Sequence, residues 1–219
     1  MMDTTTNRIE VLGNDRLKIL ASVVHSAGTD ELLPVLTYVK LATDGYTVNA
    51  YATDRYTMAI ASLPIATTEP AVVYIPAVAL AKFVTARREL MIARNDVDEY
   101  GRITWALSDG SETVSGRLYP FNYPNVDGLW HREHVAADTP WSIDIRYLSR
   151  LERMSKTACI NGKSRGTVQS GKNFKWTFCV PEKGVAVAIC GPLTMMFLPQ
   201  RQDQELTSAA YGYIDWKRN

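Results

Sequence analysis

The sequence predicts an α+β protein in which antiparallel sheets carry helices on one face. Three observations lead to this prediction: strand-like segments dominate the chain, short turns join them, and only three segments have helical spacing. Strands and helices do not alternate regularly, as they do in parallel α/β enzyme folds. No GxGxxG, GxxxxGK[ST] or HExxH motif occurs, so neither a nucleotide-binding enzyme nor a zinc hydrolase is indicated.

Composition and charge are those of an ordinary globular chain. Hydrophobic residues make up 46% and charged residues 21% of the 219 residues, which excludes wholesale disorder. The formal net charge is only +1, so any contact with nucleic acid must come from a local patch. No apolar run approaches the roughly 18 residues of a membrane span, and the N-terminus lacks a signal-peptide core. Three cysteines without a CxxC pair fit a reducing compartment, so we expect a cytoplasmic protein with no membrane partner.

In the first half of the chain, short strands are interrupted by two helices. Apolar residues at helical spacing predict a helix over 15–26, with Asp15 as its N-cap. An Asp-Gly pair at 44–45 separates two segments rich in Val, Tyr and Thr, which is typical of a β-hairpin. Pro76 opens a second helix over 77–88, because proline is tolerated in the first helical turn. Strands are predicted over 33–42, 46–52, 56–65, 72–76, 89–95, 102–107 and 112–118.

A boundary between two domains is predicted within 119–140, where three prolines occur without clean periodicity. Beyond it we predict a strand at 141–145, a helix over 146–157 and strands near 166–170, 174–180, 184–190 and 193–198. The chain is therefore divided into a domain over 1–127, a shorter domain over 128–201 and a tail over 202–219. Aromatic residues in the tail suggest that it docks on the protein's own surface.

The predicted helix over 146–157 carries a basic stripe. Arg146, Arg150 and Arg153 stand at i, i+4 and i+7 and so share one helix face. Over residues 140–175 the local net charge is +6, in a chain whose total is +1. That distribution is typical of a surface that contacts phosphates, although a solvated helix face with no partner is an equally good alternative.

Apolar residues complete the same helix. Leu148, Leu151 and Met154 recur every third residue and are predicted to pack on a sheet. The two earlier helices also carry more basic than acidic residues. Without base-stacking aromatic residues beside them, such cations would hold duplex DNA by its backbone and read no sequence. The residues predicted to make these contacts are Arg16, Lys18, Lys82, Arg87, Arg88, Arg146, Arg150, Arg153 and Lys156.

Four segments follow one another in a recognisable order: ATDRYTMAIASLPI (52–65), VVYIPAVALAKFV (72–84), SGRLYPFNYPNVDGLW (115–130) and MMFLPQR (195–201). They resemble, respectively, the ATDGHRLA-type hairpin, the helix that follows it, the stretch leading to an FPDY segment and the C-terminal VVMPMR of one family. That family is the bacterial DNA polymerase III beta subunit, the replicative sliding clamp. The order and spacing match its middle domain and the end of its last domain. The resemblance covers residues 15–130 well and 140–201 more loosely.

This resemblance implies a DNA-clamp fold, with antiparallel sheets outside and helices lining one face. In the family, two or three protomers close into a ring around double-stranded DNA, and basic helices line the hole. The chain would then be a DNA sliding clamp, a processivity factor without catalytic residue, cofactor or metal. A DNA polymerase and a clamp loader would bind through short linear peptides in a hydrophobic groove. Carried over by position, the groove residues are Leu36, Thr53, Arg55, Tyr56, Thr57, Met58, Pro124, Leu129, Met196, Leu198, Pro199 and Arg201.

The chain departs from the family in its groove and in its length. Arg55 stands where the family usually has Gly, Thr57 where it has Arg, and Gln200 replaces the second Met of VVMPMR. The resemblance therefore implies an altered peptide preference. The bacterial protomer has three domains, whereas this chain has room for two. A ring closed by the usual number of domains would be a homotrimer, which suggests a phage or mobile-element clamp working in the bacterial host cytoplasm.

Other interpretations concern an enzyme and a monomer. His131 and His134 with Glu133 could ligate a metal, but no further ligand accompanies them and an exposed linker explains them better. Asp44 and Asp54 recur in ATDGYT and ATDRYT, and the turn chemistry of aspartate accounts for both without catalysis. The main rival to the ring is a monomeric clamp-like protein that binds partners and does not encircle DNA.

Overall fold

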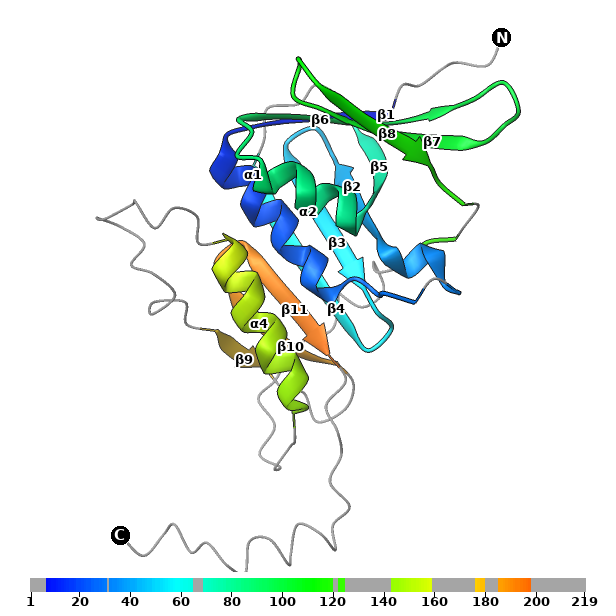
Figure 1. Cartoon of the computed structure of the whole chain (residues 1–219). Helices are drawn as coiled ribbons and strands as arrows, with labels where there is room; N and C mark the ends of the chain where they lie inside the picture. The colour runs from blue at the N-terminus through cyan, green and yellow to red at the C-terminus, as the bar shows by residue number, and fades with distance from the viewer. Residues whose placement is uncertain are drawn as a thin grey trace, which may run out of the picture.

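The computed structural model describes residues 7–30, 32–64, 69–119, 122–124, 143–158, 176–179 and 185–197. Its strands form two antiparallel sheets, and its α-helices lie together over one face of the larger sheet (Figure 1). The predicted α+β class is therefore confirmed. The predicted strand near 166–170 and the tail over 202–219 lie outside the described residues. Among the described residues, no helix has the length and apolarity needed to cross a membrane.

The larger sheet has seven strands in the order β5-β2-β3-β4-β11-β10-β9. The Asp-Gly pair at 44–45 joins β2 to β3 as predicted, and β4 pairs with β11 so that Met58 stands opposite Met196. The sheet therefore runs without a break from residues of the predicted first domain into residues of the second. The strands are β2 (Tyr38–Thr43), β3 (Thr47–Thr53), β4 (Thr57–Pro64), β5 (Ala71–Pro76), β9 (Thr177–Cys179), β10 (Ala186–Cys190) and β11 (Leu193–Phe197).

The smaller sheet has the order β1-β6-β7-β8 and is tied to the larger one by a side chain. Asn95 in β6 accepts the backbone N–H of Tyr74 at 2.6 Å and donates to its carbonyl at 3.0 Å. A buried amide thus satisfies backbone groups at the edge of β5, where no further strand pairs among the described residues. The sequence analysis missed β1. The strands are β1 (Asn7–Leu12), β6 (Leu90–Val97), β7 (Ile103–Ser108) and β8 (Thr113–Arg117).

The first two helices differ from prediction at their ends. Helix α1 (Asn14–Ala21) begins one residue before Asp15, which is therefore not its N-cap, and continues as the 3₁₀ turn η1 (Ser22–Ser26). Its first N–H, that of Asn14, donates instead to Glu89 Oε2 at 3.0 Å, a distant acceptor that local sequence cannot reveal. A second 3₁₀ turn, η2, spans Pro34–Thr37, and helix α2 spans Ala77–Thr85. Helix α2 stops short of residue 88 because Arg87 has a φ of 56°, in the left-handed region.

Helix α4 (Ile145–Ala158) corrects two predictions. The strand predicted at 141–145 is wrong over its described residues, because Ile145 starts the helix and Asp144 caps it by accepting the N–H of Arg146 at 2.8 Å. Leu148 is exposed, and Tyr147 packs in its place. Because an α-helix has about 3.6 residues per turn, residues spaced three apart drift around its axis. Residues 147, 151, 154 and 158, which are spaced four, three and four apart, lie on one face and are buried.

One apolar core joins the helices to both sheets. Leu17 of α1, Leu80 of α2 and Met154 of α4 are fully buried in it, together with Phe197 of β11. A smaller cluster lies on the other face of the larger sheet, because Met58 and Ile60 alternate along β4 with alanines of the main core. Both faces of β4 are therefore covered.

Candidate functional surfaces

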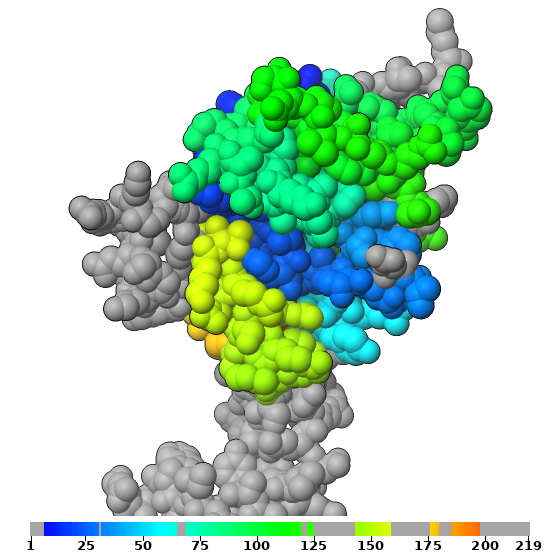
Figure 2. All heavy atoms as spheres, in the orientation of Figure 1, coloured from blue at the N-terminus to red at the C-terminus, as the bar shows by residue number. Residues whose placement is uncertain are grey.

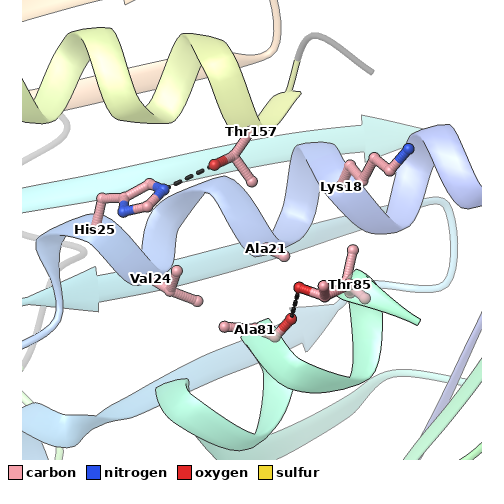
Figure 3. A pocket seen from close by; sticks show the side chains of 8 residues that line it. Lys18, Ala21, Val24, His25, Ala81, Thr85 and Thr157 are labelled. Carbon is pink, nitrogen blue, oxygen red and sulfur yellow. Dashed lines mark hydrogen bonds between the residues drawn. The ribbon is translucent and has the colours of Figure 1, made fainter. Parts of the chain in front are cut away.

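The helices form one continuous surface. Helix α1 lies between α4 and α2, and the three adjoin on one face of the molecule (Figures 1 and 2). A cavity of about 240 Å³ lies where they meet (Figure 3). His25 bridges this seam, with Nε2 hydrogen-bonded to Thr157 Oγ1 at 2.7 Å. The cavity is lined by residues of all three segments, among them Lys18, Ala21, His25, Ala81, Thr85 and Thr157.

Some predicted DNA contacts on this surface keep an uncompensated charge. Within the described part of the chain, five of them form no ion pair. All are exposed or half-exposed, and each of the three helices or its end contributes at least one. Free cations spread over adjoining helices are available to a phosphate backbone. These residues are Arg16, Lys18, Lys82, Arg87 and Arg153.

Three other predicted DNA contacts are paired with nearby carboxylates. Arg88 forms ion pairs with Asp109 and Glu112 and stacks on the Phe83 ring at 4.8 Å, so that its side chain is only 16% exposed. Arg146 pairs with Asp144 and, by hydrogen bonding, lowers the pKa of that carboxyl to about 2. Lys156 pairs with Glu152 at 2.6 Å, which lowers the pKa of the glutamate. Their charge is largely compensated within the protein.

Arg150 docks helix α4 onto the hairpin between β3 and β4. Its Nη1 lies 2.6 Å from Asp54 Oδ2, and it also donates to the hydroxyl of Thr57. Both charged side chains are largely shielded, at 22% and 14% exposure. The stripe predicted from the sequence is therefore divided, because Arg153 faces solvent while Arg150 is used inside the fold.

The hairpin that Arg150 contacts repeats the geometry of the preceding one. Asp54 Oδ1 accepts the backbone N–H of Tyr56 at 3.1 Å and of Thr57 at 2.8 Å. Asp44 Oδ1 makes the same two bonds in its own turn, at 2.9 and 2.7 Å. Turn chemistry therefore accounts for both aspartates, as the sequence predicted.

The predicted groove residues divide between the two faces of the larger sheet. Met58 and Met196 are cross-strand neighbours on the face opposite α4, at 6% and 2% exposure. Ile60 and Val187 complete this cluster and were missed, although the unbroken apolar segment around β4 indicated a strand covered on both faces. Thr57 lies on the other face, where its hydroxyl meets Arg150.

Tyr123 belongs to the same face as the methionines, and Pro124, which follows it, is half-buried. The Tyr123 hydroxyl donates to the carbonyl of Tyr51 at 3.0 Å, and its ring lies 5.6 Å from that of Tyr74. Burial raises the pKa of Tyr123 strongly, so it stays a neutral hydrogen-bond donor. Tyr51 also packs against the methionine cluster, which brings Tyr123 to its border.

The remaining groove residues lie at the turn or outside the described residues. Leu36 and Thr53 are buried, and their carbonyls both accept the N–H of Gly28, at 2.8 and 3.2 Å. Arg55 and Tyr56 are exposed at the tip of the hairpin, and Tyr56 is 62% exposed. Outside the described residues are Leu129, Leu198, Pro199 and Arg201, together with the rejected metal ligands His131, Glu133 and His134. In the part of the chain that is described, no cluster of three potential metal ligands occurs.

Comparison with known proteins agrees with this arrangement. Residues 12–98, which contain α1, the twin hairpins and α2, match the family described as DNA polymerase III beta subunit, central domain. The beta subunit of Borrelia burgdorferi, solved in complex with a natural product, superposes with a TM-score of 0.69 at 12% identity over 93% of this chain. The chain folds as a bacterial sliding clamp. No curated protein matches it in sequence.

Other sliding clamps superpose over similar lengths. The Pseudomonas aeruginosa clamp bound to griselimycin has a TM-score of 0.61 at 13% identity, covering 96% of this chain and 67% of its own. The Thermotoga maritima beta subunit has a TM-score of 0.58 at 9% identity, covering 96% and 66%. The chain spans 65% of the length of the Borrelia burgdorferi protein. The resemblance to the beta subunit is thereby confirmed, and it extends beyond the central domain to α4 and β11.

Proposed function

We propose that this protein is a DNA sliding clamp, a processivity factor that encircles duplex DNA as a homotrimeric ring and catalyses nothing. The proposal is supported by the central-domain match, the clamp fold and one observation that carries it: cations without an ion-pair partner among the described residues cover the adjoining surface of three helices. In a ring with sheets outside and helices inside, this surface faces the DNA. The site of action is the cytoplasm, where the DNA and the replication enzymes are.

The proposed contact with DNA is electrostatic. Lysine and arginine side chains that meet only phosphates hold any sequence equally and let the protein slide. The proposed contacts are the unpaired cations of the helix surface, while the paired Arg88, Arg146, Arg150 and Lys156 contribute less. Removing one phosphate-binding side chain should make the slope of log K against log salt shallower by about 0.9.

The second proposed partner is a DNA polymerase or clamp loader bound through a short linear peptide. The face that carries Met58, Met196 and Tyr123 is apolar, and the exposed Arg55 and Tyr56 precede Met58 at the tip of the β3–β4 hairpin. An apolar face that follows exposed polar residues suits one anchor residue of a peptide.

Retention on circular DNA tests encirclement. We expect the protein to stay on a nicked circular plasmid at a salt concentration that removes ordinary electrostatic binding, and to leave the same plasmid once it is linearised. A ring that surrounds the duplex can leave only over an end. Equal release from circular and linear DNA would contradict the proposal.

Charge reversal tests which surface faces the DNA. The triple variant Arg16→Glu, Lys82→Glu, Arg153→Glu changes one cation on each helix and should abolish retention. A matched control reverses three exposed arginines of the smaller sheet, Arg8, Arg94 and Arg117, with the same change in net charge. The control should retain the plasmid. Loss of retention in both variants would show an effect of overall charge rather than of the helix surface.

A monomeric clamp-like binding protein is the second candidate. It is favoured by two observations: the chain spans only 65% of the Borrelia burgdorferi protein, and four predicted DNA contacts are neutralised by carboxylates. Light scattering separates the two functions. A particle near three times 24.5 kDa supports the ring, and a strict monomer at micromolar concentration supports the alternative.

A further inference from the structure

Two turns with the same hydrogen bonds differ at the one position where the backbone is left-handed. Gly45 occupies that position in the β2–β3 turn with a φ of 98°, and Arg55 occupies it in the β3–β4 turn with a φ of 82°. In each turn, the N–H of this residue donates to the hydroxyl of the preceding threonine, Thr43 or Thr53. Glycine adopts such a conformation freely, whereas a residue with a side chain is strained there. The left-handed backbone conformation at position 55 therefore disfavours an arginine there.

The side chain of Arg55 is exposed and has no polar partner among the described residues. It forms no ion pair or hydrogen bond there, and only its backbone N–H is bonded, at 3.2 Å. The adjacent carboxylate of Asp54 is already taken by Arg150 at 2.6 Å. The turn thus presents an exposed, uncompensated guanidinium at a strained position, and such strain is typically kept where it serves a function.

The neighbours of Arg55 indicate what kind of molecule it meets. Tyr56 beside it is a 62% exposed aromatic residue, and Met58 follows on the apolar face after about 10 Å of chain. Arginine and tyrosine together are enriched at the centres of protein interfaces. The unpaired cations proposed to contact DNA lie instead on the helices, and no other free cation of the described residues stands in this hairpin.

We infer that Arg55 is a specificity-determining residue, which pairs with a carboxylate of the peptide that binds beside Tyr56. The guanidinium offers parallel N–H donors that match the two oxygens of Asp or Glu. A peptide residue rises about 3.3 Å along an extended chain, so the acidic residue stands two or three positions from the apolar anchor. This inference rests on the proposed function, because it assigns a chemistry to the same peptide site.

Selection from a random peptide library tests the inference. Nine-residue peptides displayed on phage are selected on the wild-type protein, on Arg55→Gly and on Arg55→Lys. We expect the wild type to enrich Asp or Glu within three positions of an apolar residue, Arg55→Lys to keep part of that preference, and Arg55→Gly to lose it. The best wild-type peptide, made synthetically, should bind Arg55→Gly roughly two- to fivefold more weakly.

A thermal melt distinguishes a loss of peptide binding in Arg55→Gly from a loss of folding. Removal of the strained side chain should raise the Tm of Arg55→Gly by about 1–4 °C while its affinity for the peptide falls. If Arg55 had a merely structural role, the Tm and the affinity would fall together. An unchanged acidic preference in Arg55→Gly would overturn the inference and leave the proposed function standing. Failure of all three proteins to enrich any peptide would overturn the peptide site itself. Loss of plasmid retention by Arg55→Gly with unchanged peptide selection would make Arg55 a DNA contact and overturn the inference.

Discussion

Asp44 and Asp54 show how the same residue acquires different roles in the same local structure. Both carboxylates accept two backbone N–H groups of their own turn, and in the exposed Asp44 these bonds lower the pKa. Only Asp54 also meets a cation among the described residues, Arg150 of α4. The first role is local and belongs to the turn. The second joins residues almost a hundred positions apart.

Replacing each aspartate by asparagine separates these roles. Asparagine keeps the Oδ1 acceptor, so Asp44→Asn should cost well under about 1 kcal/mol of unfolding free energy. Asp54→Asn also leaves the largely shielded Arg150 without its counter-charge and should cost about 1–2 kcal/mol more. Urea denaturation measures both. Equal losses would contradict the role of the ion pair, and combining Asp54→Asn with Arg150→Met should recover part of the difference.

The left-handed conformation of Arg55 leads to a prediction about stability that is independent of any ligand. Arg55→Gly should raise the unfolding free energy by about 0.5–1 kcal/mol, because relief of left-handed strain exceeds the added entropy of an unfolded glycine. Gly45→Arg in the twin turn should lower it by a similar amount. Denaturation in urea compares the two. A loss of stability in Arg55→Gly would mean that the arginine side chain supports the fold.

At the scale of elements, the burial of helix α4 depends on Tyr147. Tyr147 is 9% exposed and its ring centroid lies 5.8 Å from that of Phe197, whereas Leu148 is 37% exposed. Tyr147→Ala should therefore lower the unfolding free energy by about 2–4 kcal/mol, and Leu148→Ala by less than about 1 kcal/mol. The opposite order in urea denaturation would place the helix in a different rotation about its axis.

The seam between η1 and α4 responds to pH through His25. The ring is hydrogen-bonded to Thr157, and Arg153 and Lys18 are the cations near it. Burial lowers the pKa of His25, and the charge of Arg153 lowers it further. The unfolded chain therefore takes up a proton near pH 6.5 that the folded chain resists, so stability falls as pH drops below that value.

This pH effect has a measurable limit. One group changes the unfolding free energy by at most about 1.4 kcal/mol per pH unit. We expect the unfolding free energy, measured by urea denaturation, to fall between about pH 7.5 and about pH 5.5, a range that brackets the ordinary pKa of histidine. The fall should be smaller in His25→Gln than in the wild type. The same slope in both proteins would mean that carboxylates elsewhere cause the loss.

At the scale of the whole molecule, one sheet unites both predicted domains and leaves open edges. Among the described residues, strand β9 ends the larger sheet and β8 ends the smaller one, and Val114 in β8 is 49% exposed. Edge strands that pair with no further strand among the described residues permit head-to-tail pairing between copies, and such pairing closes a ring when the rotation between copies is right. The proposed ring therefore needs an unobstructed β8.

A charge at this edge tests that requirement. Val114→Lys should lower the native mass from a trimer to a monomer, because an exposed lysine opposes edge-to-edge pairing. The variant should keep its monomeric fold, since Val114 is not part of the core. Light scattering and circular dichroism measure the two effects, with Tyr100→Lys, a change at another exposed apolar residue outside β8, as the control. An unchanged mass in Val114→Lys would move the contact away from this edge.

Much of the fold could be predicted because its signals are local. Alternating or continuous apolar segments, the Asp-Gly turn and a proline before a helix identified most strands and the approximate helices. The predicted helix starts were wrong where the capping group was distant or unrecognised. Glu89 accepts the first N–H of α1, and Asp144 caps α4 at a position where a strand was predicted. Of the candidate sites, motif position placed Met58 and Met196 in one predicted groove, but only the structure showed that they pair across β4 and β11 and that Ile60 and Val187 join them.

The sequence by itself determined the strand and helix segments, the turn chemistry of Asp44 and Asp54, and the likeness to the sliding-clamp family. These depend on residues close together in the chain, whose preferences survive in any tertiary setting. Only the tertiary structure decided which cations are free. Arg150 and Arg153 share one helix and one predicted stripe, yet Asp54 from the β3–β4 hairpin compensates the first and leaves the second to solvent. A charge is available to a partner only when folding brings no opposite charge beside it, and that is a property of the packed molecule.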